Sequence, residues 1–165
     1  MKVYILWGMS DKNLLWSKEL AQTIIDTKKY QSDFQIYQHR IDPEQGMDFS
    51  LEQQRFIEQV NNLWTEYCLV CKSIGIIIFL KSLPSFKYPP KQVILCGINL
   101  ELAQRYHAEI KDVDFPLTLL QNPWDPAGTF EDTRKALHNR VNRQIVEGIG
   151  DTHTYNIDLI LQQLS

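Results

Sequence analysis

The sequence has no long apolar run. None of its hydrophobic stretches approaches the roughly 18 residues that a membrane-spanning helix requires, so we expect no membrane segment. Its N-terminus enters the apolar stretch "VYILW" (3–7) without the features of a targeting peptide, which predicts a cytoplasmic protein. A net charge of −3 gives no strong signal for nucleic acid as a partner. The length of 165 residues and the 44% hydrophobic content predict a single globular domain over residues 1–165.

Cysteine is scarce, with only Cys68, Cys71 and Cys96. Three cysteines do not make the disulfide framework of a secreted protein. The pair in "CLVC" (68–71) has neither a second such pair nor two spaced histidines to complete a metal set. We therefore expect buried free thiols, no bound metal and no cofactor.

Several site motifs are also missing. The segment "GMSDKN" (8–13) has one glycine where a dinucleotide fingerprint needs three, and no P-loop occurs elsewhere. A phospho-acceptor domain would need an aspartate where Lys81 and Ser82 follow an expected strand. No G-x-S-x-G elbow is found, and the chain is shorter than expected for an α/β hydrolase. These absences argue against all four classes.

Hydrophobic spacing predicts alternating strands and helices. The clearest helix has apolar residues three and four apart from Phe56 to Cys71, and "IGIIIFL" (74–80) resembles a strand covered on both faces. Residues 92–96 fit a strand or a helix; we favour a helix over 91–111, because a parallel crossover needs a longer connection. The expected strands are 3–7, 33–41, 74–80 and 116–121; the expected helices are 12–28, 50–71, 91–111, 129–147 and 154–164.

This order predicts a three-layer α/β fold with a mostly parallel sheet of four or five strands. Right-handed crossovers make it doubly wound and flavodoxin-like, with an extra C-terminal helix. Ligands of such sheets bind at the carboxyl ends of the strands. Among the residues that this rule selects are those after the first and fourth expected strands: Gly8, Ser10, Asp11, Asn122, Trp124 and Asp125.

Glu101 is a second candidate for chemistry. It lies between Leu100 and Leu102, with Gly97 one turn before it and Arg105 one turn after it. A carboxylate with space beside it suits covalent glycosyl transfer, in which the ionised acid attacks an anomeric carbon. A solvated carboxylate paired with Arg105 is the other interpretation.

Three stretches resemble the nucleoside 2-deoxyribosyltransferase family: "YILWGMSDKNLLWSKELAQTI" (4–24), "GIIIFL" (75–80) and "GINLELAQ" with "FPLTLL" (97–104 and 115–120). The related Toll/interleukin-receptor-type NAD-cleaving domains share the layout. The resemblance implies that Glu101 is a nucleophile, with Gly97 and Ala103 in the positions of the family's glycine and small residue. The family's aspartate before the third strand is replaced here by Ser73.

The resemblance implies an N-glycosidase or a deoxyribosyltransferase that acts on a nucleoside or nucleotide. Asp11 or Asp125 would then engage the base or sugar, and Trp7 or Trp124 would stack on the base. The alternative is a non-catalytic α/β module that binds a small ligand or a protein. In that case the apolar face of the last helix, from Ile157 to Leu164, would mediate assembly into a homo-oligomer.

Overall fold

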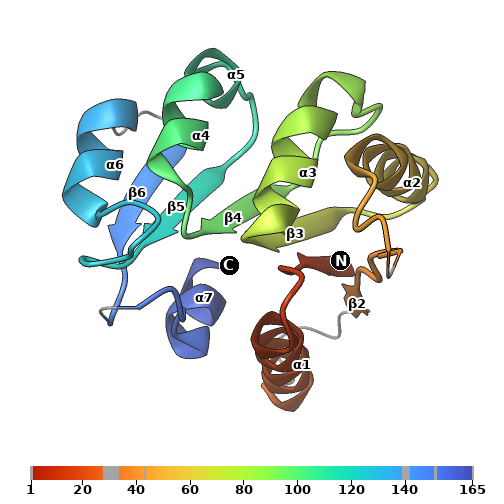
Figure 1. The fold of residues 1–165 in the computed structure, drawn as a ribbon, viewed down its shortest axis with the longest axis horizontal. Helices are drawn as coiled ribbons and strands as arrows, with labels where there is room; N and C mark the ends of the chain where they lie inside the picture. The colour runs from red at the N-terminus through yellow and green to blue at the C-terminus, as the bar shows by residue number, and fades with distance from the viewer. Residues whose placement is uncertain (1, 28–33, 43, 139–141, 151, 165) are drawn as a thin grey trace.

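A computed structural model describes residues 2–27, 34–42, 44–138, 142–150 and 152–164 (Figure 1). The strands are β1 (Lys2–Leu6), β2 (Phe34–Ile36), β3 (Tyr67–Lys72), β4 (Gln92–Cys96), β5 (Leu117–Gln121) and β6 (Arg143–Glu147). The helices are α1 (Asp11–Asp26), α2 (Phe49–Asn61), α3 (Ile74–Ser82), α4 (Leu100–Arg105), α5 (His107–Lys111), α6 (Phe130–Leu137) and α7 (Ile157–Gln163), and a 3₁₀ turn, η1 (Leu83–Ser85), follows α3.

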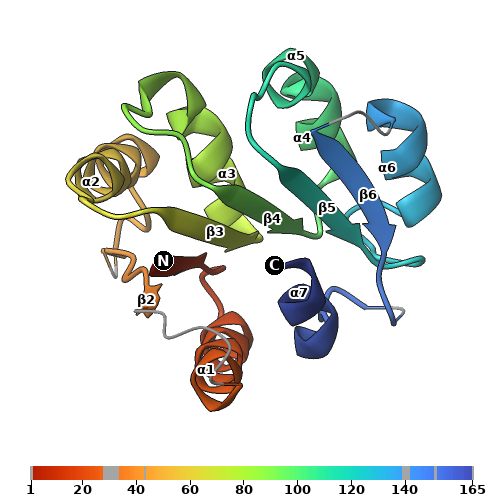
Figure 2. The same ribbon diagram turned by 180° about the vertical axis from the view of Figure 1, so that it is seen from behind.

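The strands form one parallel six-stranded sheet in the order β2-β1-β3-β4-β5-β6. Helices α1 and α7 cover one face, and α2 to α6 cover the other (Figures 1 and 2). Each face has its own apolar cluster, one around Leu20, Ile24 and Ile160 and the other around Phe56, Phe79 and Leu119. The predicted three-layer α/β architecture with a parallel sheet is confirmed, but the sheet has six strands instead of four or five.

The predictions for residues 62–82 were wrong. The expected helix 50–71 ends at Asn61, and β3 occupies Tyr67–Lys72 with all six residues buried. The expected strand 74–80 is helix α3, which is apolar on nearly every side because it packs between the sheet and α2. Periodicity cannot separate a buried strand from a fully buried helix, since neither shows a polar face.

The predictions for the segments that contain β4 and β6 also need correction. The expected helix over 91–111 is strand β4 followed by α4 and α5, and β4 pairs in parallel with β3. Helix α3 provides the crossover that we had assumed to be missing. The expected helix 129–147 is α6 followed by β6, and residues 139–141 between them lie outside the described residues. Strands β1 and β5 and helices α1 and α7 lie where they were predicted, within a few residues at each end; Lys28, the expected end of the first helix, lies outside the described residues.

Within the described part of the chain, no helix has the length and apolar character that crossing a bilayer demands.

Candidate active site

Ser73 stands at a sharp turn between strand β3 and helix α3. Its backbone has φ 55° and ψ −124°, a conformation that a residue with a side chain adopts only at a cost in free energy. With this backbone conformation the strand passes directly into the helix, and the half-buried serine lies at the carboxyl edge of the sheet. A strained strand–serine–helix turn is the geometry of a nucleophile elbow.

Two glycines permit the close packing around this turn. A Cβ atom on Gly75 would lie 2.7 Å from Cβ of Leu6, so only glycine lets α3 cross β1 at this distance. A Cβ atom on Gly8 would lie 2.8 Å from Oγ of Ser73. The loop that leaves β1 therefore passes directly beside the serine hydroxyl.

A buried carboxylate and a histidine face each other at the same edge. Asp125 follows β5 and is only 2% exposed, while His153 follows β6; Nδ1 of His153 lies 2.7 Å from Oδ2 of Asp125. The Tyr155 hydroxyl donates a hydrogen bond to the same oxygen, and the Ala127 N–H donates to Oδ1. Burial opposes ionisation of Asp125, but these hydrogen bonds outweigh it and lower the pKa of the carboxyl group.

Gly97 places this histidine beside the serine turn. Lys72 and Cys96 are paired across β3 and β4, so Ser73 and Gly97 are the next residues of two adjacent strands. Gly97 has φ 77°, and a Cβ atom there would lie 2.6 Å from Cε1 of His153. The imidazole thus packs on Gly97, one strand away from Ser73. Its Nδ1 is bonded to Asp125, which leaves Nε2 as the ring atom that can exchange a proton.

The loop that carries the histidine is fixed by Asn122. The side-chain amide of this fully buried residue donates to the carbonyl oxygens of Thr152 and Thr154, at 2.6 and 2.9 Å. These two residues flank His153. Asn122 therefore sets the height of the imidazole above the sheet.

A buried lysine lies immediately before the serine. Lys72 is 4% exposed, donates to Oδ1 of Asn13 and stands 5.4 Å from the ring centroid of Trp16. Burial lowers the pKa of its ammonium group, and the negative charge of Asp125 partly offsets that effect. The contact ties the first turn of α1 to the end of β3.

Among the described residues, no group of three or more histidine, cysteine, aspartate or glutamate side chains is arranged to hold a metal ion. Cys68 and Cys71, the pair considered in the sequence, lie in β3 as buried thiols.

The structure distributes the sequence-predicted residues unevenly. Gly8 and Gly97 lie beside the Ser73 turn, and Asn122 and Asp125, after β5, hold the loop of His153. The Trp7 ring is buried and donates to the carbonyl oxygen of Tyr37. The remaining predicted residues are exposed: Ser10 and Asp11 at the start of α1, Trp124 before Asp125, and Glu101 in the first turn of α4.

Ser73 and His153 were not selected from the sequence. The signal for the serine was "CKSIG" (71–75), an elbow in which Cys71 stands at the first glycine position. Because residues 67–71 were assigned to a helix, the strand that must precede such a turn was not recognised.

No family model matches the chain, and no curated protein sequence matches it. Solved structures do match over nearly the whole chain. An N-formylmaleamic acid deformylase from Pseudomonas putida superposes with a TM-score of 0.72 at 10% identity, covering 99% of this chain and 91% of its own. A monoacylglycerol lipase from Paleococcus ferrophilus gives 0.68 at 13% identity, with 93% and 86% covered. An esterase from Pyrococcus furiosus gives 0.66 at 11% identity, with 99% and 78% covered.

These likenesses establish the fold, which is that of the α/β hydrolases. They overturn the resemblance to nucleoside 2-deoxyribosyltransferases and to NAD-cleaving domains, and with it the nucleoside N-glycosidase function assigned to Glu101. The flavodoxin-like description is not confirmed either. We expected an α/β hydrolase to need a longer chain. That expectation was wrong, because these 165 residues cover 91% of the deformylase chain.

Proposed function

We propose that this protein is a serine hydrolase that cleaves carboxylic esters or related acyl compounds through Ser73, His153 and Asp125. The observation that carries the proposal is the strained backbone of Ser73, at φ 55° and ψ −124°, at the same sheet edge as the hydrogen-bonded pair of His153 and the buried Asp125. The three residues also occur in the chain order serine, aspartate, histidine, as in α/β-hydrolase triads. The structural neighbours named above, a deformylase, a lipase and an esterase, support the same class.

The proposed reaction begins when Oγ of Ser73 attacks the carbonyl carbon of the substrate. Nε2 of His153 accepts the hydroxyl proton, and Asp125 stabilises the imidazolium that forms. The proton then passes to the leaving alcohol as the carbon–oxygen bond breaks, and the acyl group stays on Ser73 as an ester. A water molecule, deprotonated by His153, cleaves that ester, and the proton returns to Ser73 as the carboxylic acid leaves.

The negative oxygen of each tetrahedral intermediate needs hydrogen-bond donors. In this fold the donors are the N–H of the residue after the nucleophile and an N–H from the loop after the neighbouring strand. Here these are the N–H of Ile74, in the first turn of α3, and a backbone N–H of the Gly8–Met9 turn. The closeness of Gly8 to Ser73 Oγ supports that assignment.

Labelling with a fluorophosphonate tests the proposal. The reagent transfers its phosphonyl group to an activated serine, with fluoride as the leaving group, and peptide mass spectrometry locates the adduct. We expect one adduct on Ser73 and none in Ser73→Ala, which should also lose roughly 10³-fold or more of its activity on p-nitrophenyl acetate. Ser50→Ala, which removes an exposed serine on α2, is the matched control. A protein that is folded, unlabelled and inactive would contradict the proposal.

A further inference from the structure

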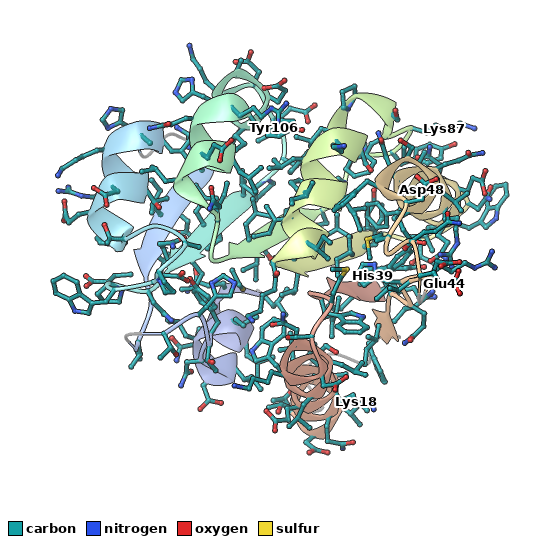
Figure 3. All side chains as sticks on the ribbon, viewed as in Figure 1. Lys18, His39, Glu44, Asp48, Lys87 and Tyr106 are labelled. Carbon is teal, nitrogen blue, oxygen red and sulfur yellow. The ribbon has the colours of Figure 1, made fainter. Side chains whose placement is uncertain are left out.

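A buried charged cluster lies beside the proposed active site without touching the triad. His39 comes after β2, and its ring stands beside the β1 ribbon and below α2 (Figure 3). Its Nδ1 lies 3.3 Å from Oε2 of Glu52, and its Nε2 lies 2.9 Å from the carbonyl oxygen of Trp7. The side chains of His39 and Glu52 are 0% and 1% exposed.

The partners of this ring determine which of its nitrogens carry protons. A carbonyl oxygen only accepts hydrogen bonds, so Nε2 must carry a proton to bond with Trp7. The carboxylate of Glu52 accepts from the guanidinium of Arg55 and from the N–H of Arg40, which is the pattern of an ionised acid. Nδ1 of His39 faces this carboxylate, so Nε2 is the ring nitrogen left to bond with Trp7.

The Trp7 carbonyl belongs to the peptide that leads into Gly8, the residue that packs against Ser73. Trp7 precedes Gly8, and the Gly8 position lies 2.8 Å from Ser73 Oγ as measured to its would-be Cβ. The Trp7 indole is held as well, because its Nε1 donates to the Tyr37 carbonyl at 2.6 Å and its ring lies 5.3 Å from that of His39. Fixing the Trp7 carbonyl fixes the plane of the Trp7–Gly8 peptide, and hence the direction of the Gly8 N–H from which the Gly8–Met9 turn starts.

We propose that His39, held by Glu52, is a positioning residue that aims the backbone donors of the Gly8–Met9 turn at the negative oxygen formed on Ser73. The inference rests on the proposed hydrolase function and adds a residue outside the triad. The contact acts on the transition state, because the oxyanion exists only there. Loss of the hydrogen bond should therefore lower kcat and leave KM nearly unchanged.

Two isosteric substitutions separate this role from a merely structural one. In His39→Gln the amide nitrogen occupies the place of Nε2 and can still donate to Trp7. In His39→Asn the shorter side chain puts its amide nitrogen at the place of Nδ1, within reach of Glu52 and out of reach of Trp7. Both replacements are uncharged amides, so the two variants differ in which partner of His39 the side chain can still reach. His107→Asn, at the start of α5, is the control for histidine replacement.

With p-nitrophenyl acetate, we expect His39→Asn to lower kcat roughly 10- to 100-fold with KM within about twofold, and His39→Gln to stay within about threefold of wild type. The dissociation constant of phenylboronic acid, which forms a tetrahedral adduct on Ser73, should rise in His39→Asn by the same factor as kcat falls. Equal activity of His39→Asn and wild type, or equal losses in the two variants that follow their unfolded fractions, would overturn the inference.

A measurement on the wild type covers the case in which neither variant folds. Nitrogen-15 NMR of the His39 ring should show a proton on Nε2 that is protected from exchange; a bare Nε2 would overturn the inference. The proposed function fails separately, since an inactive and unlabelled wild type removes both proposals. An active wild type with an indifferent His39 removes only this one.

Discussion

His153 and Asp125 meet at 2.7 Å although 28 residues separate them in the chain. Parallel strands β5 and β6 end at the same edge of the sheet, so the loops that follow them converge. The Tyr155 hydroxyl completes the arrangement by donating to the same Asp125 oxygen. The carboxylate is thus held by both residues, and the second ring nitrogen of His153 takes no part in this contact.

Because Gly97 packs against His153, a methyl group at position 97 should lower both stability and activity. Gly97→Ala should unfold roughly 1–3 kcal/mol more easily, because a non-glycine residue at φ 77° is strained and its Cβ would collide with His153 and Tyr155. Esterase activity should fall as well, since the imidazole must move. Urea unfolding and hydrolysis of p-nitrophenyl acetate measure the two effects.

Gly46→Ala is the matched control for this substitution. Gly46 has φ 79°, and nothing lies within 4 Å of a Cβ atom placed there. It carries the same backbone strain without the collision, and activity should be unchanged. Identical behaviour of the two variants would show that the Gly97 contact is irrelevant.

The hydroxyl of Tyr155 should contribute to both stability and catalysis, because it donates to the carboxylate that holds His153. Tyr155→Phe keeps the ring but removes one hydrogen bond to the Asp125 carboxylate, which should cost about 1–2 kcal/mol of stability and lower kcat several-fold, with KM nearly constant. Tyr67→Phe removes a comparable hydroxyl, bonded to the Tyr88 carbonyl at 2.8 Å at the opposite end of the sheet. If both variants lost kcat equally, a specific role for Tyr155 would be excluded.

Local signals account for what the sequence predicted correctly. Strand β1 and helix α1 were located because Gly8 ends an apolar run and Ser10 caps the helix, its hydroxyl accepting from the Asn13 N–H. The rule that ligands bind at strand carboxyl ends placed Gly8 and Asp125 at that edge of the sheet, and their part in a site stays a prediction. Both kinds of inference depend only on neighbours in the chain.

The elbow escaped prediction because its defining property is a backbone strain maintained by tertiary packing. Nothing in "CKSIG" requires φ 55° at Ser73; the conformation follows from β3 and α3 being packed against β1. His153 had no partner at a recognisable spacing, since its partner is supplied by strand pairing. In the sequence, Glu101 was more distinctive than Ser73 or His153, because its apolar neighbours Leu100 and Leu102 suggested a pocket; in the structure it is exposed.

Stability should depend on pH through Asp125. Hydrogen bonds lower the pKa of this carboxyl below its ordinary 3.8, so the folded protein keeps the charge where the unfolded chain takes up a proton. The resulting stabilisation is complete above about pH 4 and is lost as the pH falls through the lower folded value. Urea unfolding between pH 2 and 6 should show that the difference between wild type and Asp125→Asn shrinks below pH 4. A difference that is constant over this range would contradict the assignment.

The three cysteines should not react with alkylating reagents in the native protein, and this distinguishes a serine nucleophile from a thiol nucleophile. Burial raises the pKa of Cys96 to about 12 and that of Cys68 to about 11, and it also raises the pKa of Cys71, which lies two residues before Ser73. Only the thiolate reacts with alkylating reagents, so iodoacetamide at pH 7.5 should modify none of the three thiols in the native protein. Activity should survive this treatment and disappear with a fluorophosphonate. Intact-mass spectrometry provides the measurement, and the same reaction in concentrated guanidinium chloride should add three groups. Alkylation of Cys71 in the native state, with parallel loss of activity, would contradict Ser73 as the nucleophile and indicate Cys71 instead.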